Sequence, residues 1–129
     1  MIVVDSNVVA YLYLPGANTP RAEALLQEDS EWVVPVLWRS EFRNILAGYM
    51  RRHMISFDQA CALQREAEGL LRGAEYEVDS LSVLELVRDR ACSAYDGEFV
   101  ALAMKLGTKL ITLDAKLLRA FPQHAKKLA

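Results

Sequence analysis

Two kinds of hydrophobic spacing alternate along the chain and predict its elements. Short apolar runs rich in β-branched residues are typical of strands covered on both faces, whereas apolar residues three or four positions apart are typical of helices with one buried face. Strands are predicted at 2–4, 32–34 and 109–113, with a less apolar one at 75–78. Helices are predicted at about 6–13, 19–28, from 36, from 56, from 80 or 82, 93–106 and 114–120.

Capping and turn residues support several of these helices. Thr19-Pro20 predicts an N-cap followed by proline at the first helical position. Ser56 and Gln59 have the spacing of a capping box, and Gly107 is placed to end the helix that Ser93 begins. The segment 123–129 is too polar for its pattern to predict whether it adds an edge strand.

The order of these elements predicts the fold class. Strands that alternate with one or two helices need crossover connections, which are right-handed and produce a parallel sheet covered by helices on both faces. We therefore expect a three-layer α/β/α domain with a central parallel sheet of four to five strands. At 129 residues, without a repeat or linker, the chain is expected to form a single domain spanning residues 1–129.

Charge and cysteine content narrow the possible partners and compartment. The net charge is only −2, so any contact with nucleic acid must use a local basic patch. Cys61 and Cys92 belong to no metal-binding or redox spacing, which is typical of reduced thiols in a cytosolic protein. The N-terminus begins a strand at once, and no long apolar stretch follows. A cytoplasmic protein without a signal peptide or membrane span is expected.

Four acidic residues are predicted to meet at one edge of the sheet. Asp5 and Asp114 each end a predicted strand, and ligands of open parallel sheets bind outside the carboxyl ends of the strands. Glu41 and Asp96 share helix rows with apolar residues, so their carboxylates are expected to point inward. Like charges about 4 Å apart repel by about 4 kcal/mol at an effective dielectric near 20, so such a cluster needs protonation or a cation. Oxygen ligands without His or Cys suit Mg²⁺ or Mn²⁺.

Most of these residues also have an ordinary structural explanation. Asp5 and Asp114 are placed to cap helices, and Asp96 follows Ser93 at capping-box spacing. Glu41 is predicted to lie neither at a helix start nor on a polar face. Glu41 is therefore the hardest of the four to explain without a functional role.

At these residues the chain resembles the PIN-domain ribonucleases, in particular the VapC-type toxins of type II toxin–antitoxin systems. The matching segments are Val-Val-Asp5-Ser-Asn-Val, Arg-Ser-Glu41-Phe-Arg-Asn, Ser-Ala-Tyr-Asp96-Gly-Glu-Phe-Val-Ala-Leu-Ala and Leu-Ile-Thr112-Leu-Asp114-Ala-Lys-Leu. They occur in the family's order and cover nearly the whole chain, and the tyrosine–aspartate helix is the most specific of them. The chain departs from the family in having Gly97 where alanine is usual and in lacking an apolar last strand, but neither departure removes an acidic position.

The resemblance implies a metal-dependent endoribonuclease that hydrolyses RNA phosphodiester bonds with one or two Mg²⁺ or Mn²⁺ ions. Asp5, Asp96 and Asp114 are the candidate metal ligands, and Glu41 is a further ligand or a group that positions water. Ser6, Asn7 and Thr112 have the short polar side chains needed to orient a carboxylate or a bound water, although Ser6 is equally well explained as an N-cap. The resemblance also implies a homodimer and an antitoxin protein that covers or enters the acidic site.

Basic residues on the helix that carries Glu41 are candidates for contact with RNA or antitoxin. They are Arg39, Arg43, Arg51 and Arg52. A solvated helix face with cations at its C-terminal end explains the same pattern.

Other functions fit the chain less well but stay open. Haloacid-dehalogenase-like phosphatases use Asp-x-Asp after the first strand, whereas Asn7 stands at the second position here. A receiver domain leaves Glu41 without a purpose. The remaining alternatives are a catalytically silent binding module on the same fold and another metal-dependent phosphohydrolase of this fold class.

Overall fold

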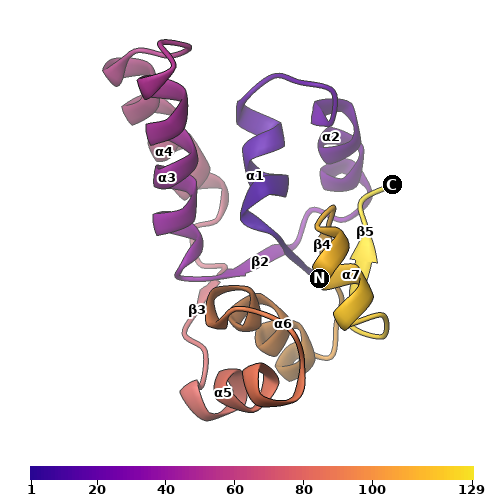
Figure 1. The fold of residues 1–129 in the computed structure, drawn as a ribbon. Helices are drawn as coiled ribbons and strands as arrows, with labels where there is room; N and C mark the ends of the chain where they lie inside the picture. The colour runs from indigo at the N-terminus through magenta and orange to yellow at the C-terminus, as the bar shows by residue number, and fades with distance from the viewer.

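The computed structural model describes residues 1–129 and contains a parallel five-stranded sheet in the order β3-β2-β1-β4-β5 (Figure 1). The strands are β1 (Ile2–Val4), β2 (Trp32–Pro35), β3 (Glu75–Tyr76), β4 (Leu110–Thr112) and β5 (Ala125–Lys127). The helices are α1 (Ser6–Tyr13), α2 (Thr19–Glu28), α3 (Trp38–Arg51), α4 (Phe57–Leu70), α5 (Ser80–Asp89), α6 (Ala94–Leu106) and α7 (Ala115–Ala120). Helices cover both faces of the sheet, which confirms the predicted three-layer α/β/α fold with a parallel sheet.

The central strand is apolar because both of its faces are covered. Val3 and Val4 of β1 are fully buried, and α1 and α6 lie on opposite sides of the sheet in Figure 1. The predicted apolar stripe of α3 is also present, with Trp38 and Phe42 fully buried. None of the helices is both long and apolar enough to cross a membrane.

The C-terminal segment, whose pattern was too polar to predict a strand, forms one. Ala125–Lys127 pairs in parallel with β4 and brings the sheet to five strands. An edge strand hydrogen bonds on one side only, and charged side chains are common there. Ala125 and Leu128 are buried while the two lysines between them are exposed, so the apolar positions are too few to give a strand pattern.

The N-cap of α2 differs from the one predicted. α2 begins at Thr19 itself, so the N-cap is Asn18; the Thr19 hydroxyl instead donates to the Tyr11 carbonyl at 2.6 Å. α5 begins at Ser80, one of the two predicted starts, and is capped by Asp79, whose carboxylate accepts from the Ser82 N–H at 3.0 Å.

The predicted end and packing of α6 follow from two glycines. Gly107 ends the helix with a φ of 65°, in the left-handed region that glycine adopts readily. Gly97 lies against α5, where an added Cβ would be 3.3 Å from Val83 Cγ1. The close approach of α5 to α6 therefore favours glycine beside Asp96.

Candidate active site

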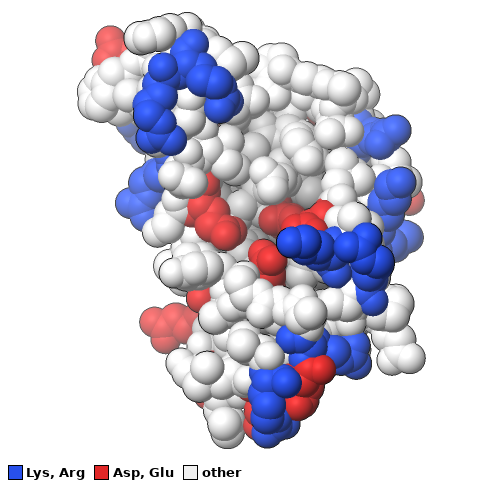
Figure 2. Space-filling view, in the orientation of Figure 1, with Lys and Arg blue, Asp and Glu red and all other residues white.

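The four predicted carboxylates line one hollow beyond the carboxyl ends of β1 and β4. Asp5, Glu41, Asp96 and Asp114 all contribute to its lining, and its volume is about 390 Å³. Figure 2 shows acidic side chains gathered at the centre of this face. The sequence thus correctly predicted that these residues, which are up to 109 positions apart in numbering (114 − 5), meet at one edge of the sheet.

Thr112 links two of the carboxylates through its buried hydroxyl. Its Oγ1 donates to Asp5 Oδ2 at 2.7 Å and accepts from the Asp114 N–H at 3.0 Å. Asp114 in turn caps α7, because its Oδ1 accepts from the N–H groups of Lys116 and Leu117. Helix capping and a place in the acidic hollow are therefore combined in Asp114.

Glu41 is held by Ser6 from the neighbouring helix. The Ser6 hydroxyl is buried and donates to Glu41 Oε1 at 2.7 Å. Glu41 lies in the first turn of α3, so the prediction that it stands away from a helix start is wrong, because α3 begins at Trp38 rather than at Val36. Its side chain nevertheless reaches toward α1 and the hollow. Ser6 does not cap α1, whose N-cap is Asp5.

Asp96 enters the hollow from the opposite layer of the fold. It lies in the first turn of α6, and its backbone N–H donates to Ser93 Oγ at 3.1 Å. Ser93 is therefore the N-cap that the sequence predicted. The carboxylate of Asp96 is half-buried and faces the charges of Asp5 and Asp114.

Burial and mutual repulsion favour protonation of three of these carboxylates. Burial raises the pKa of Asp5, more than the hydrogen bond from Thr112 lowers it. Burial also raises the pKa of Glu41, to which the charges of Asp5 and Asp96 add. The pKa of Asp96 is raised by burial and by the charges of Asp5 and Asp114, against which Lys116 has a smaller effect. At neutral pH, a cation would relieve this repulsion.

The donor atoms of the hollow fit a hard divalent cation. None of the four carboxylates forms an ion pair with Lys or Arg. In Asp5, Glu41 and Asp114, side-chain and cap hydrogen bonds engage a single oxygen of each carboxylate. As the side chains stand, however, no three Asp, Glu, His or Cys residues converge closely enough to hold an ion. The residues therefore fit Mg²⁺ or Mn²⁺ by chemistry and charge, while the coordination sphere needs side-chain rotation.

The predicted basic residues do not form one free surface. The Arg39 guanidinium binds Glu75 through two nitrogens, at 2.5 and 2.7 Å, and binds Glu68 at 3.0 Å. Arg43 donates to the Arg39 carbonyl, and the Arg52 guanidinium lies over the Tyr49 ring. Arg43, Arg51 and Arg52 are exposed. Arg39 is the one of the four whose charge is already paired.

The structure also brings in residues that the sequence did not single out as functional. The hollow is lined by Ser40 and Asn44 of α3 and by Tyr95 of α6, together with the predicted Asn7. Figure 2 shows Lys and Arg side chains gathered beside the acidic centre, over α7, whose cations are Lys116 and Arg119. Positions 40 and 44 follow one row of the helix next to Glu41, which is the local signal that could have identified them.

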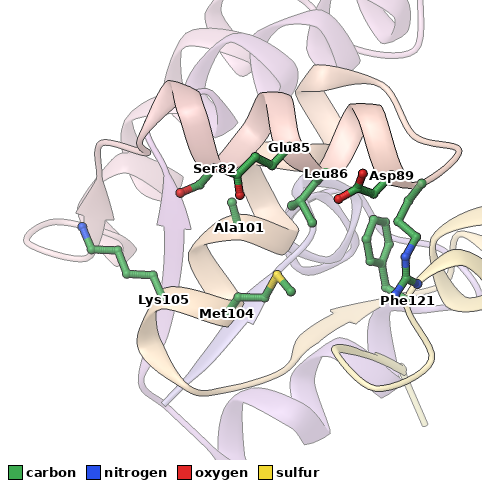
Figure 3. A pocket seen from close by; sticks show the side chains of 9 residues that line it. Ser82, Glu85, Leu86, Asp89, Ala101, Met104, Lys105 and Phe121 are labelled. Atoms are coloured by element: carbon green, nitrogen blue, oxygen red, sulfur yellow. The ribbon is translucent and has the colours of Figure 1, made fainter.

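A larger cavity, of about 580 Å³, lies between α5 and α6 and away from the four carboxylates (Figure 3). Its side chains are a mixture of both charges with apolar groups, including Glu85, Lys105 and Phe121. The Arg90 guanidinium lies over the Phe121 ring, with 5.5 Å from Cζ to the ring centre. No set of nucleophilic or acid–base groups converges there, so we place the candidate chemistry in the smaller acidic hollow.

Comparison with known proteins agrees with this geometry. Residues 2–121 match the family model of the PIN domain. The chain is 30% identical to Ribonuclease VapC3 of Pyrobaculum aerophilum over 94% of its own length and 95% of that protein. Among solved structures, PAE2754 from Pyrobaculum aerophilum superimposes with a TM-score of 0.76 at 19% identity, covering 98% of this chain and 83% of that one. A toxin–antitoxin complex from Klebsiella pneumoniae gives 0.69 at 14% identity, covering 100% and 98%. The chain therefore belongs to the PIN-domain family and is a homologue of the VapC ribonucleases.

Proposed function

We propose that the protein is a metal-dependent endoribonuclease, the toxin of a toxin–antitoxin pair, that hydrolyses RNA phosphodiester bonds with one or two Mg²⁺ or Mn²⁺ ions. The observation that carries this proposal is the shared hollow of Asp5, Glu41, Asp96 and Asp114, in which three pKa values are raised and no carboxylate is ion-paired. The homology to a VapC ribonuclease supports RNA as the substrate.

Each acidic residue has a distinct part in the proposed chemistry. Asp5, Asp96 and Asp114 would hold the cation, and Glu41 would hold it too or orient the attacking water through its second carboxylate oxygen. A bound divalent cation supplies activation of water and neutralises charge at the reacting phosphate. Ser6 and Thr112 keep Glu41 and Asp5 in fixed orientations through their hydroxyl hydrogen bonds. Asn7 lines the hollow with an exposed amide that is able to bind water or substrate.

Partners are part of the same proposal. Similarity to a toxin–antitoxin complex supports an antitoxin as partner. We propose in addition that the antitoxin covers the acidic hollow and that the toxin is a cytoplasmic homodimer. We propose that the exposed Arg43, Arg51 and Arg52 contact RNA or antitoxin, with Arg39 placed among them but paired to Glu75. Reversal of charge at Arg43 should then weaken RNA binding and flatten its dependence on salt, measured by titration at several salt concentrations. Unchanged RNA binding would show that Arg43 does not contact the RNA.

The cleavage assay tests the proposed function directly. RNA is incubated with wild-type protein in Mg²⁺ or Mn²⁺, with EDTA, and with Asp96→Asn protein. We expect cleavage only with the cation, and at least about 100-fold slower cleavage by Asp96→Asn. Asp58→Asn is the matched control, since Asp58 also lies in the first turn of its helix but is outside the hollow.

Two results would contradict the proposal in different ways. Cleavage that survives both EDTA and Asp96→Asn would exclude the metal mechanism. If no RNA is cleaved while a partner protein binds tightly, the chain is a binding module that keeps the fold without the activity.

A further inference from the structure

The acidic hollow has an uncharged wall as well as an acidic part. Leu37, Ser40, Asn44 and Ile45 line it from α3, and Tyr95 lines it from α6. This wall combines an aromatic ring, two aliphatic side chains, an amide and a hydroxyl. None of these groups carries a charge that would pair with a phosphate, and together they match a nucleobase, which has flat apolar faces and hydrogen-bonding edges.

Tyr95 is the aromatic member of this wall, and it is exposed without a structural role of its own. Its exposed fraction is 64%, and neither its ring nor its hydroxyl takes part in any of the aromatic, cation–π or hydrogen-bond contacts of the structure. By contrast, the Tyr13 ring packs edge-on against Phe42, and Arg52 covers Tyr49. The Tyr95 ring therefore presents a free aromatic face beside Asp96.

The position of Tyr95 is fixed although its ring is exposed. It is the second residue of α6, whose start is capped by Ser93. Two residues later, Gly97 packs closely against Val83 of α5 and holds this turn in place. A ring on a rigid helix start loses little freedom on binding, which favours its use as a platform for a ligand.

We propose that Tyr95 stacks against an unpaired nucleobase next to the phosphate in the acidic hollow, with Asn44 and Ser40 facing the edge of that base. This inference rests on the proposed function and deepens it, because it assigns the binding of one unpaired base of the RNA to a single side chain. Bases within a duplex are stacked on one another and leave no free face for the tyrosine.

Fluorescence of 2-aminopurine tests the stack, since this base is quenched when it stacks. Single-stranded RNAs of about 12 nucleotides, within the site size of single-strand binding grooves, carry the probe in four sequence contexts. Binding is measured with Mg²⁺ in the Asp5→Asn background, and RNA integrity is checked by gel. We expect quenching, its loss in Tyr95→Leu and its retention in Tyr95→Phe. Tyr95→Leu should also bind roughly 5- to 100-fold more weakly, the range for one base–aromatic stack.

Two controls separate stacking from a general loss of fold or affinity. Phe57→Leu removes an exposed ring on α4 outside the hollow and should leave binding and quenching unchanged. An abasic RNA should bind wild type and Tyr95→Leu equally, because the partner of the ring is then missing. In cleavage assays, Tyr95→Leu should raise KM more than it lowers kcat.

The outcomes separate this inference from the proposed function. If wild type cleaves RNA while Tyr95→Leu binds and quenches like Phe57→Leu, the stack is disproved and the ribonuclease stands. Preference for duplex over single strand, or no binding of any single strand, also overturns the inference. Quenching that depends on Tyr95 without cleavage by wild type supports the base site and contradicts the ribonuclease.

Discussion

Two buried hydroxyls orient two carboxylates of the acidic hollow. Thr112 is fully buried between Asp5 and the backbone of Asp114, and Ser6 binds Glu41. Each hydroxyl donates to one carboxylate oxygen and so restricts the orientation of that carboxylate. At the scale of single residues, catalysis is therefore expected to depend on groups that themselves touch no substrate.

Thr112→Val tests this dependence with little change of volume. The variant removes the donor to Asp5 and leaves the Asp114 N–H without its acceptor, which should cost about 1 to 3 kcal/mol of unfolding free energy. Activity or cation affinity should fall by about 10- to 100-fold. Thr112→Ser keeps the hydroxyl and should retain most of both. Equal activity in the valine and serine variants would show that the hydroxyl has no positioning role.

Sequence alone identified the four carboxylates of the hollow, with Ser6, Asn7 and Thr112, but not the partner of each side chain. Asp5 and Asp114 were predicted because each follows a strand, which is a local signal. Ser6 was left between N-cap and functional group, and its actual partner, Glu41, lies 35 positions away. The spacing of residues within one helix does not report which side chain of another helix it meets, so the contact between Ser6 and Glu41 could not be predicted. Tyr95 was noted only as part of a motif, because exposure is a property of the folded surface.

At the scale of elements, the contact between α5 and α6 fixes the helix that carries Asp96. Gly97 permits this contact, since alanine would place its Cβ 3.3 Å from Val83 Cγ1. The family resemblance treats glycine here as a departure from alanine. Packing explains why glycine occupies this position. Glycine stabilises a helix less than alanine does, but its lack of a Cβ leaves room for the Val83 side chain.

Gly97→Ala should therefore gain less stability than an unobstructed glycine-to-alanine change. In α3, Gly48→Ala is the matched control, because its new Cβ meets only the end of the Arg52 side chain at 3.5 Å. We expect Gly48→Ala to stabilise by roughly 0.5 to 1 kcal/mol and Gly97→Ala to stay near zero or destabilise. Urea unfolding of both variants measures the difference. An equal increase in unfolding free energy for the two variants would show that the Val83 side chain moves aside at no cost.

Elements were predicted well where the signal is local. The Ser56–Gln59 capping box is present with both of its hydrogen bonds, and the helix from Ser93 ends at Gly107 as predicted. The strand at 125–127 was left open because its stability comes from backbone pairing with β4, which side-chain pattern does not report.

At the scale of the whole molecule, the carboxylates proposed to bind the cation also lower the stability of the metal-free protein when they are ionised. Folding raises the pKa of Asp5, Glu41 and Asp96, chiefly by burial. Between their ordinary values near 4 and the raised ones, the native state binds more protons than the unfolded state. Stability of the metal-free protein therefore falls as pH rises through that range.

The Asp5→Asn variant should remove part of this pH dependence. Its amide oxygen still accepts from Thr112, but no charge remains to be buried. In EDTA, we expect its unfolding free energy to exceed that of wild type increasingly from about pH 4 toward neutral pH, and added Mn²⁺ to narrow the difference. Chemical denaturation across this range checks both trends. A difference that shrinks as pH rises would contradict the assigned direction of the Asp5 shift.

Cation binding is the central claim, and calorimetric titration of Mn²⁺ at neutral pH tests it most directly. Wild type and the Asp58→Asn control should bind with equal affinity, and Asp96→Asn should bind at least about 10-fold more weakly. Asp96 and Asp58 are both first-turn aspartates, but only Asp96 lines the hollow. Equal affinity in all three proteins, or no binding by wild type, would show that the four carboxylates do not form a cation site.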